Sequence, residues 1–215
     1  MSDARIREQI CAAGASLFER GLTHGSTGNI SARTDDGGFL VTPTGTSLGR
    51  LDPARLARFD ASCVHVSGDT PTKEVQVHRA FYETRGKAGA VVHLHSCHSV
   101  ALSMLPDVDT ESFLPPLTPY SIMLLGRVRL LPVYLPGDPA MSDAIRSLAG
   151  RRSAVMLANH GPVVSAKDIE AACNAIEELE ATARLALLTR NLGPVALSPQ
   201  EVARVVERFG VEWDE

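Results

Sequence analysis

The sequence predicts an α/β or α+β fold built on a central sheet, and three observations support it. Apolar residues recur at helical spacing in several segments, and short apolar runs typical of strands alternate irregularly with them. The turn formers of residues 35–38 join two such runs as a hairpin. The 215 residues, 44% hydrophobic and 21% charged, suit one globular domain over residues 1–215.

The clearest helical pattern opens the chain, over residues 3–20, and Gly21 stands where such a helix ends. Ser165-Ala-Lys-Asp168 has the pattern of a capping-box start for a long helix. The further segments expected to be helical are residues 75–82, 96–105, 138–149, 168–189 and 198–208.

Strands are expected where apolar, β-branched residues form short runs between turn formers. These runs are residues 30–33, 38–42, a segment within 56–66, and residues 90–95, 128–134 and 154–158. The Pro-rich residues 106–120 are expected to be irregular.

Charge and cysteine usage narrow the class of protein. A net charge of −4 makes nucleic acid an unexpected partner. The four cysteines form no CxxC pair, which favours reduced thiols. No apolar signal core opens the chain, and no window approaches the roughly 20 apolar residues of a membrane helix. We therefore expect a soluble, cytoplasmic protein with no membrane partner.

The sharpest local feature is His93-Leu94-His95. Residues i and i+2 of a strand point to the same side, so these two imidazoles can bind one metal ion. His160 follows the apolar run 154–158 and is favoured as a third ligand over His98, which a helix beginning near Ser96 would turn away. The other histidines carry no spacing signal and are expected to be ordinary core or surface residues: His24, His65 and His78.

Three neutral imidazoles leave the full charge of a divalent ion available to polarise a carbonyl oxygen. Such chemistry needs a base, and Glu74 at the start of a predicted helix is the candidate. A carboxylate at this position can also simply interact favourably with the helix dipole.

Three loops rich in hydroxyls and glycine could hold a phosphate group, or be plain turns: Ser26-Thr27-Gly28-Asn29, Thr44-Gly45-Thr46 and Thr72-Lys73.

Five motifs occur in an order that resembles the class II aldolase/adducin family. They are residues 28–31 (Gly-Asn-Ile-Ser), 41–45 (Val-Thr-Pro-Thr-Gly), 73–74 (Lys-Glu), 92–96 (Val-His-Leu-His-Ser) and 158–161 (Ala-Asn-His-Gly), within a match over roughly residues 5–190. The resemblance implies an α/β/α sandwich around a mainly antiparallel sheet, like that of fuculose-phosphate aldolase, and a homotetramer.

The resemblance also assigns residues. It implies His93, His95 and His160 as zinc ligands, with Glu74 as catalytic acid/base and possible fourth ligand; manganese or cobalt could also function. It implies phosphate contacts from Gly28, Asn29, Thr44, Gly45, Thr72 and Lys73. Family aldolases often have two serines where Thr72-Lys73 stand, so the lysine departs from their pattern.

One subgroup resembles the chain more closely, the 3-oxo-tetronate 4-phosphate decarboxylases. The residues that carry this likeness are 67–69, 71–75, 114–120, 136–139 and 157–163. It implies metal-dependent loss of CO2 from a small phosphorylated sugar acid, through a metal-bound enediolate, to give dihydroxyacetone phosphate. Tyr120 is then a candidate proton donor or orienting group, or else a packed loop residue.

Three alternatives remain open. A class II sugar-phosphate aldolase and a ribulose-phosphate 4-epimerase use the same kind of site, because cleavage to an aldehyde leaves the same enediolate. A non-catalytic, adducin-like module is the alternative from another class. The intact set of three histidines with Glu74 argues against that module.

Overall fold

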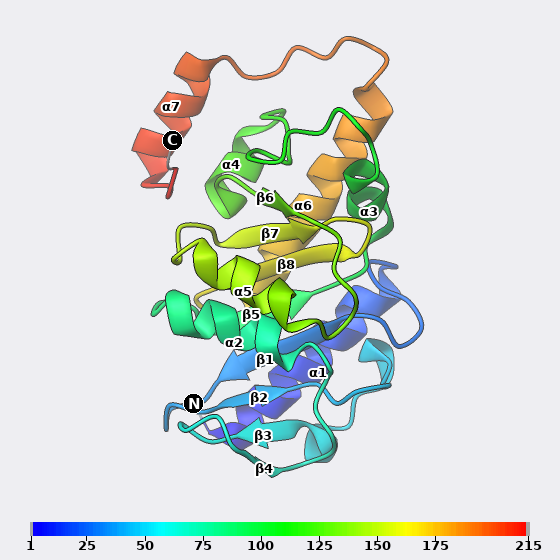
Figure 1. Cartoon of the computed structure of the whole chain (residues 1–215), viewed down its shortest axis with the longest axis vertical. Helices are drawn as coiled ribbons and strands as arrows, with labels where there is room; N and C mark the ends of the chain where they lie inside the picture. The colour runs from blue at the N-terminus through cyan, green and yellow to red at the C-terminus, as the bar shows by residue number, and fades with distance from the viewer. Residues whose placement is uncertain (1, 214–215) are drawn as a thin grey trace.

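The computed structural model describes residues 2–213, and within them the strands join in one sheet (Figure 1). The strands are β1 (Asn29–Arg33), β2 (Phe39–Val41), β3 (Ala57–Phe59), β4 (His65–Ser67), β5 (Ala90–His93), β6 (Arg129–Leu131), β7 (Ala154–Leu157) and β8 (Gly161–Ala166). Their order is β4-β3-β2-β1-β5-β8-β7-β6. Every neighbouring pair is antiparallel except β6 and β7.

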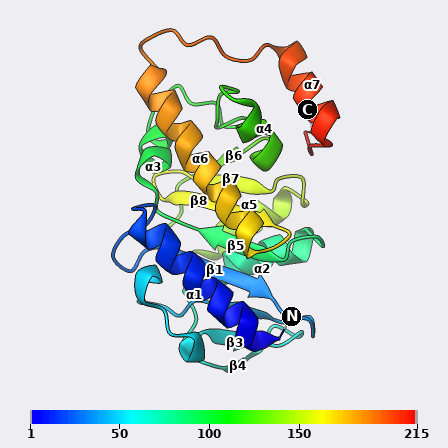
Figure 2. The same ribbon diagram turned by 180° about the vertical axis from the view of Figure 1, so that it is seen from behind.

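Helices cover both faces of this sheet. They are α1 (Asp3–Glu19), α2 (Val75–Thr84), α3 (Cys97–Ser103), α4 (Pro119–Leu125), α5 (Pro139–Ser147), α6 (Ile169–Thr189) and α7 (Pro199–Phe209), with short 3₁₀ turns at Leu48–Arg50 and Pro53–Arg55. Helices α2 and α5 lie in front of the sheet in Figure 1, whereas α1 and α6 cross its other face in Figure 2. The predicted α/β/α sandwich with a mainly antiparallel sheet is confirmed.

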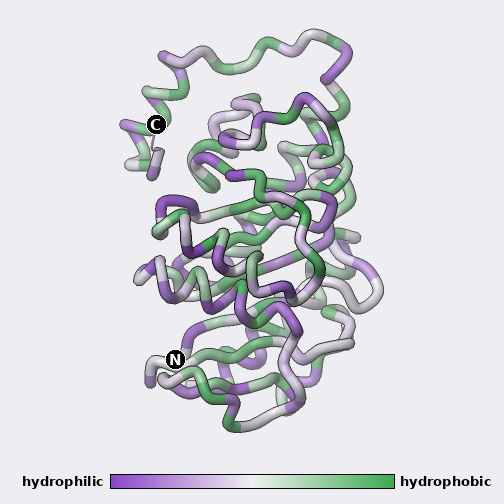
Figure 3. The backbone as a smooth tube through the Cα atoms, viewed as in Figure 1, coloured by the Kyte–Doolittle hydropathy of each residue, from purple (hydrophilic) through white to green (hydrophobic). Residues whose placement is uncertain are grey.

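Strand β5 shows how the two cores form. Val92 packs into the core that includes Ile10 of α1 and Ile176 of α6, whereas Val91 packs into the core that includes Phe81 of α2. Because side chains alternate along a strand, His93 projects to the same side as Val91, toward α2. In the hydropathy colouring of Figure 3, apolar and hydrophilic segments alternate along the chain.

Most predicted elements are present, but several boundaries differ. The segment within 56–66 forms two strands, β3 and β4, rather than one. Strand β5 ends at His93, two residues earlier than predicted, so His95 lies beyond it. Strand β6 is likewise shorter than the predicted residues 128–134.

An α-helix and a strand were not predicted. Helix α4 begins at Pro119, inside the segment expected to be irregular, and the Thr118 side chain accepts a hydrogen bond from Ser121 N at its start. Strand β8 follows β7 after a turn of three residues. A strand there also corrects the predicted capping box: Ser165 belongs to β8, and Asp168 alone caps α6 by accepting from Ala171 N at 2.8 Å.

The C-terminal part returns to the body of the molecule after an exposed linker. Helix α7 has a capping box in which Ser198 and Glu201 bond each other's backbone N–H groups. Beyond it, Glu212 pairs with Arg85 at 2.8 Å and the Trp213 ring lies under the Arg127 guanidinium. In residues 2–213 no helix is both long and apolar enough to span a membrane.

Candidate metal centre

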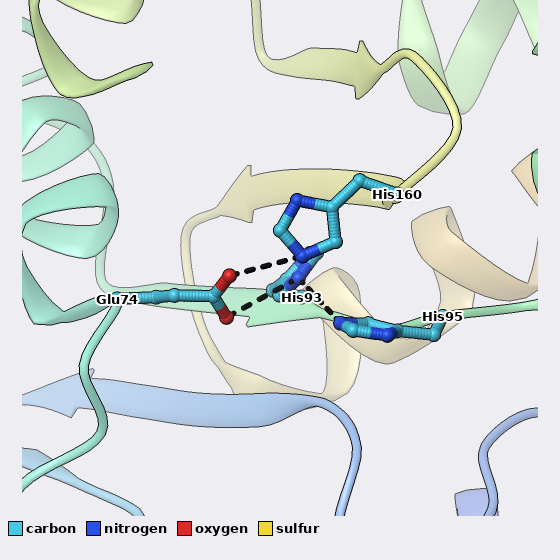
Figure 4. A group of neighbouring side chains, drawn as sticks. All are labelled: Glu74, His93, His95 and His160. Carbon is cyan, nitrogen blue, oxygen red and sulfur yellow. Dashed lines mark hydrogen bonds and ion pairs between the residues drawn. The ribbon is translucent and has the colours of Figure 1, made fainter. Parts of the chain in front are cut away.

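Four side chains with metal-binding atoms meet at one edge of the sheet (Figure 4). His93 is the last residue of β5, and His95 follows it by two residues. His160 stands in the turn from β7 to β8, and Glu74 is the N-cap residue of α2. Antiparallel pairing of β5 with β8 brings the end of one strand beside the start of the other.

The four side chains are close enough to share one ion. One nitrogen or oxygen atom from each lies within 4.8 Å of the corresponding atom of every other. The Nε2 atoms of His93 and His95 are 3.2 Å apart, and Glu74 Oε2 is 3.4 Å from His93 Nε2. Three imidazole nitrogens and a carboxylate oxygen form a donor set typical of a divalent transition metal.

One hydrogen bond fixes the orientation of the His93 ring. Its Nδ1–H donates to the carbonyl oxygen of Pro162 at 2.8 Å, which leaves Nε2 unprotonated. That lone pair faces the other three side chains (Figure 4). Backbone carbonyls orient metal-binding histidines in this way in proteins generally.

Two buried polar atoms at the cluster lack an ordinary partner. In the described part of the chain neither Glu74 Oε1 nor His160 Nε2 has a hydrogen bond of suitable geometry, although they lie 3.0 Å apart. A buried polar atom left without a partner is costly. A cation held by both atoms would remove that cost, so the residues fit a metal ion.

The electrostatics favour the protonation states that a metal needs. Burial raises the pKa of Glu74, but the neighbouring His93, His160 and Asn29 side chains stabilise the carboxylate, and its pKa lies well below the ordinary value. Burial, reinforced by the neighbouring His93, lowers the pKa of His95 to about 3. A neutral imidazole and an ionised carboxylate are the metal-binding forms of these groups.

The backbone of the β7–β8 turn that carries His160 accepts few residue types at two positions. Asn159 adopts a positive φ of 58°, which asparagine tolerates better than most residues. A Cβ atom on Gly161 would overlap the carbonyl oxygen of Leu94, beside the two histidines of the β5 end. Ser103 of α3 also accepts a hydrogen bond from Asn159 N at 3.0 Å. The turn is therefore held against the segment that carries His95.

The other histidines lie outside the cluster. His98, the competitor for third ligand, lies on α3, where its Nδ1 bonds Glu180 Oε1 at 2.8 Å. His24 and His65 are exposed. His78 is fully buried on α2, and its ring bonds Ser31 and Asn29. Glu74, His78 and Tyr82 are spaced four residues apart in the sequence. In a helix this spacing places them on one side, and that signal would have pointed to His78 as a neighbour of Glu74.

The three candidate phosphate loops lie side by side next to Glu74. Thr44 N bonds Thr70 O at 3.0 Å, and Thr72 N bonds Thr42 O at 3.2 Å. Asn29 Nδ2 donates to Thr72 Oγ1 at 3.2 Å and to Glu74 Oε2 at 2.8 Å.

Gly28 and Gly45 both have positive φ values, 81° and 70°, that suit glycine. Thr44, Gly45 and Lys73 are exposed, and Lys73 directly precedes Glu74 in the sequence.

Tyr120 is separate from these groups. It lies in the first turn of α4 and is 64% exposed. Within residues 2–213 it makes no hydrogen bond or ring contact with Glu74 or with the three clustered histidines. The ordinary alternative for Tyr120 was a tyrosine packed in a loop. The residue is instead exposed and belongs to a helix.

The chain is similar to known proteins over nearly its whole length. The model of the class II aldolase and adducin N-terminal domain family matches residues 8–187. The chain is 47% identical to a 3-oxo-tetronate 4-phosphate decarboxylase of Cupriavidus necator, over 99% of both chains. It is 32% identical to an L-fuculose phosphate aldolase of Escherichia coli, over 97% of this chain and 96% of that protein.

A solved structure shares the whole fold. YgbL from Escherichia coli, whose description offers aldolase, epimerase or decarboxylase, superposes with a TM-score of 0.92 at 41% identity, covering 94% of this chain and 98% of that one. Family model, full-length relatives and fold therefore agree: the chain belongs to the class II aldolase and adducin family.

Proposed function

We propose that this protein is a metal-dependent carboxy-lyase that converts a 3-oxo-tetronate 4-phosphate to dihydroxyacetone phosphate and CO2. The observation that carries the proposal is the 47% identity to a decarboxylase of that name over 99% of both chains. The cluster of Glu74, His93, His95 and His160 supports it, because such a cluster suits metal-assisted chemistry.

The proposed metal ligands are His93, His95 and His160, with Glu74 as a fourth in the resting enzyme. Zinc is the first choice for three imidazoles and a carboxylate, and manganese or cobalt are the alternatives. A divalent ion there supplies Lewis acidity toward the substrate's oxygen atoms when the C1–C2 bond breaks and CO2 leaves.

The chain's own side chains would handle the proton and the phosphate. After CO2 departs, C2 takes up one proton to become the hydroxymethyl group of dihydroxyacetone phosphate, and Glu74 is the group proposed to deliver it. Loop residues beside Glu74 are proposed to bind the phosphate: Gly28, Asn29, Thr44, Gly45, Thr72 and Lys73. Clustered hydroxyls and the Lys73 cation suit a phosphate dianion.

Three further predictions belong to this proposal. Tyr120 is predicted to donate a proton or to orient the substrate, from its exposed position on α4. The subunits are predicted to form a homotetramer. The enzyme is predicted to act in the cytoplasm, in the breakdown of sugar acids.

The second candidate is a sugar-phosphate aldolase, favoured by the 32% identity to L-fuculose phosphate aldolase. The two reactions differ in the group that leaves, CO2 or an aldehyde. Purified zinc-loaded protein is incubated with 3-oxo-tetronate 4-phosphates of both configurations, and CO2 and dihydroxyacetone phosphate are measured. Equimolar release of both products, lost in His95→Ala and kept in His98→Ala, is the expected result.

A different result would reject the decarboxylase. If neither configuration released CO2 while L-fuculose phosphate was cleaved to dihydroxyacetone phosphate and an aldehyde, the protein would be an aldolase. If the protein purified without stoichiometric metal and processed neither substrate, the adducin-like module would be favoured instead.

A further inference from the structure

A chain of buried hydrogen bonds leads away from Glu74 into the interior. Asn29 Nδ2 bonds Glu74 Oε2 at 2.8 Å, and Asn29 Oδ1 lies 2.5 Å from His78 Nε2. The ring's Nδ1 lies 2.7 Å from Ser31 Oγ, which in turn lies 2.7 Å from Tyr82 OH. All five side chains are buried.

The chain of bonds follows from matching periodicities in a helix and a strand. Glu74, His78 and Tyr82 are four residues apart, so they lie along one side of α2 and its N-cap. Asn29 and Ser31 are two residues apart in β1 and point to the same side of the sheet. The helix and the strand therefore contribute side chains alternately.

The donor and acceptor groups of these side chains fix the direction of each hydrogen bond from Tyr82 to Glu74. An ionised Glu74 only accepts, so Asn29 must present its NH2 group there and its carbonyl oxygen to His78. His78 Nε2 must then carry the hydrogen, and the neutral ring's Nδ1 must accept from the Ser31 hydroxyl. Ser31 is left to accept from Tyr82.

The surroundings keep the His78 ring neutral. The ring is fully buried, and burial, with the nearby His93, lowers the pKa of His78 to about 3. A charged ring would donate from both nitrogens, and Ser31 would then donate to Tyr82, leaving the Tyr82 hydroxyl hydrogen without an acceptor among the described residues. The neutral Nε2–H tautomer satisfies every member.

We propose that His78 is a positioning residue, which locks the Asn29 amide so that its NH2 group always faces Glu74 and the adjacent phosphate loop. An amide rotated by 180° would present its oxygen to the Glu74 carboxylate and remove the donor from Thr72 Oγ1. Glu74 would lose the one hydrogen-bond donor that its carboxylate has in residues 2–213. This inference rests on the proposed function for its activity readout alone.

Two amide variants distinguish the effect of losing the N–H donor to Asn29 from the effect of losing the imidazole ring. The side-chain amide of His78→Gln reaches about as far as Nε2 and keeps an N–H for Asn29, whereas that of His78→Asn reaches only as far as Nδ1. Both remove the imidazole and leave a polar group in the same place. His78→Gln should keep kcat/KM within about threefold of wild type, and His78→Asn should lose about tenfold or more, the effect of one oriented hydrogen bond.

Metal content is measured in both variants. It should match wild type, because the proposed histidine ligands are untouched. Equal kcat/KM values in His78→Gln and His78→Asn would overturn the proposal. If His78→Asn does not fold, Tyr82→Phe tests the far end of the chain and should change kcat/KM by less than His78→Asn was expected to.

A nitrogen-15 NMR measurement tests the geometry without any substrate. In the wild-type holoprotein, His78 should show a protonated Nε2 and an unprotonated Nδ1. Ser31→Ala should shift the Nδ1 resonance and leave the Nε2 proton in place. A protonated Nδ1 would overturn the inference even if the decarboxylase is established; conversely, the expected tautomer in a protein without decarboxylase activity would leave the positioning role standing and reject the proposed function.

Discussion

His93 and Pro162 are joined by a hydrogen bond of 2.8 Å, from the imidazole Nδ1–H to the backbone carbonyl oxygen. Pro162 follows His160 by two residues, so this bond links two of the proposed metal ligands through one short turn. The ring of His93 is consequently oriented before any ion binds. A site oriented in this way should lose its metal when a ligand is removed, rather than adapt to the change.

Replacing a proposed ligand by alanine should release the metal. His93→Ala, His95→Ala and His160→Ala should each lower metal affinity by about 100-fold or more, because one of the four proposed donors is lost. His98→Ala should keep stoichiometric metal, since His98 bonds Glu180 outside the cluster. Metal per chain is measured by atomic emission after dialysis. Loss of metal from His98→Ala alone would contradict the ligand set.

Glu74→Gln should separate metal binding from proton transfer. The amide has nearly the same shape and can no longer act as an acid or base, so kcat should fall by about 100-fold to 10,000-fold while the three histidines retain the ion. Both metal content and steady-state rates are measured. An unchanged kcat would remove Glu74 from the catalytic role.

Gly161→Ala should destabilise the protein and disturb the site together. The added Cβ would overlap the Leu94 carbonyl oxygen, so the turn that carries His160 must move. We expect a loss of about 2–4 kcal/mol in the free energy of unfolding, measured with urea. Gly86→Ala is the matched control, because nothing lies within 4 Å of its Cβ position; an equal loss there would show that crowding is not the cause.

Glu180→Ala should loosen the helix that follows His95. The buried carboxylate accepts hydrogen bonds from His98 N and Ser99 N, both at 2.8 Å, in the first turn of α3. Removing it leaves these N–H groups without a partner, at a cost of about 1–3 kcal/mol. Glu170→Ala on the exposed surface of α6 should change stability by less than about 0.5 kcal/mol. Thermal unfolding of the two variants checks the difference.

The stability of the metal-free protein should fall as pH decreases from about 6.5 to about 3. Burial lowers the pKa of His78 from 6.5 to about 3, so in this window the unfolded chain binds a proton that the folded chain does not. The contribution is fully present above pH 6.5 and declines by up to about 1.4 kcal/mol per pH unit below it. Urea titrations of wild type and His78→Gln should show the smaller slope in the variant. Parallel slopes would mean that His78 is protonated in the folded state.

The sequence by itself determined the layers of the fold and the main candidates for the site. Apolar residues at helical spacing predicted α1, and the hairpin signal predicted β1 and β2, because local periodicity decides which face of an element is buried. The spacing of His93 and His95 likewise predicted two imidazoles on one side of a strand. Strand β5 ends at His93, yet the two Nε2 atoms lie 3.2 Å apart.

Tertiary structure decided what local patterns could not. Strand β8 is buried on both faces and contains a proline, so it lacks the alternating pattern of a half-exposed strand. The convergence of His160 and Glu74 on His93 depends on strand order, which residues far apart in the sequence establish together. The role of His78 depends on the packing of α2 against β1, since only the alternation of side chains from both elements completes its hydrogen bonds.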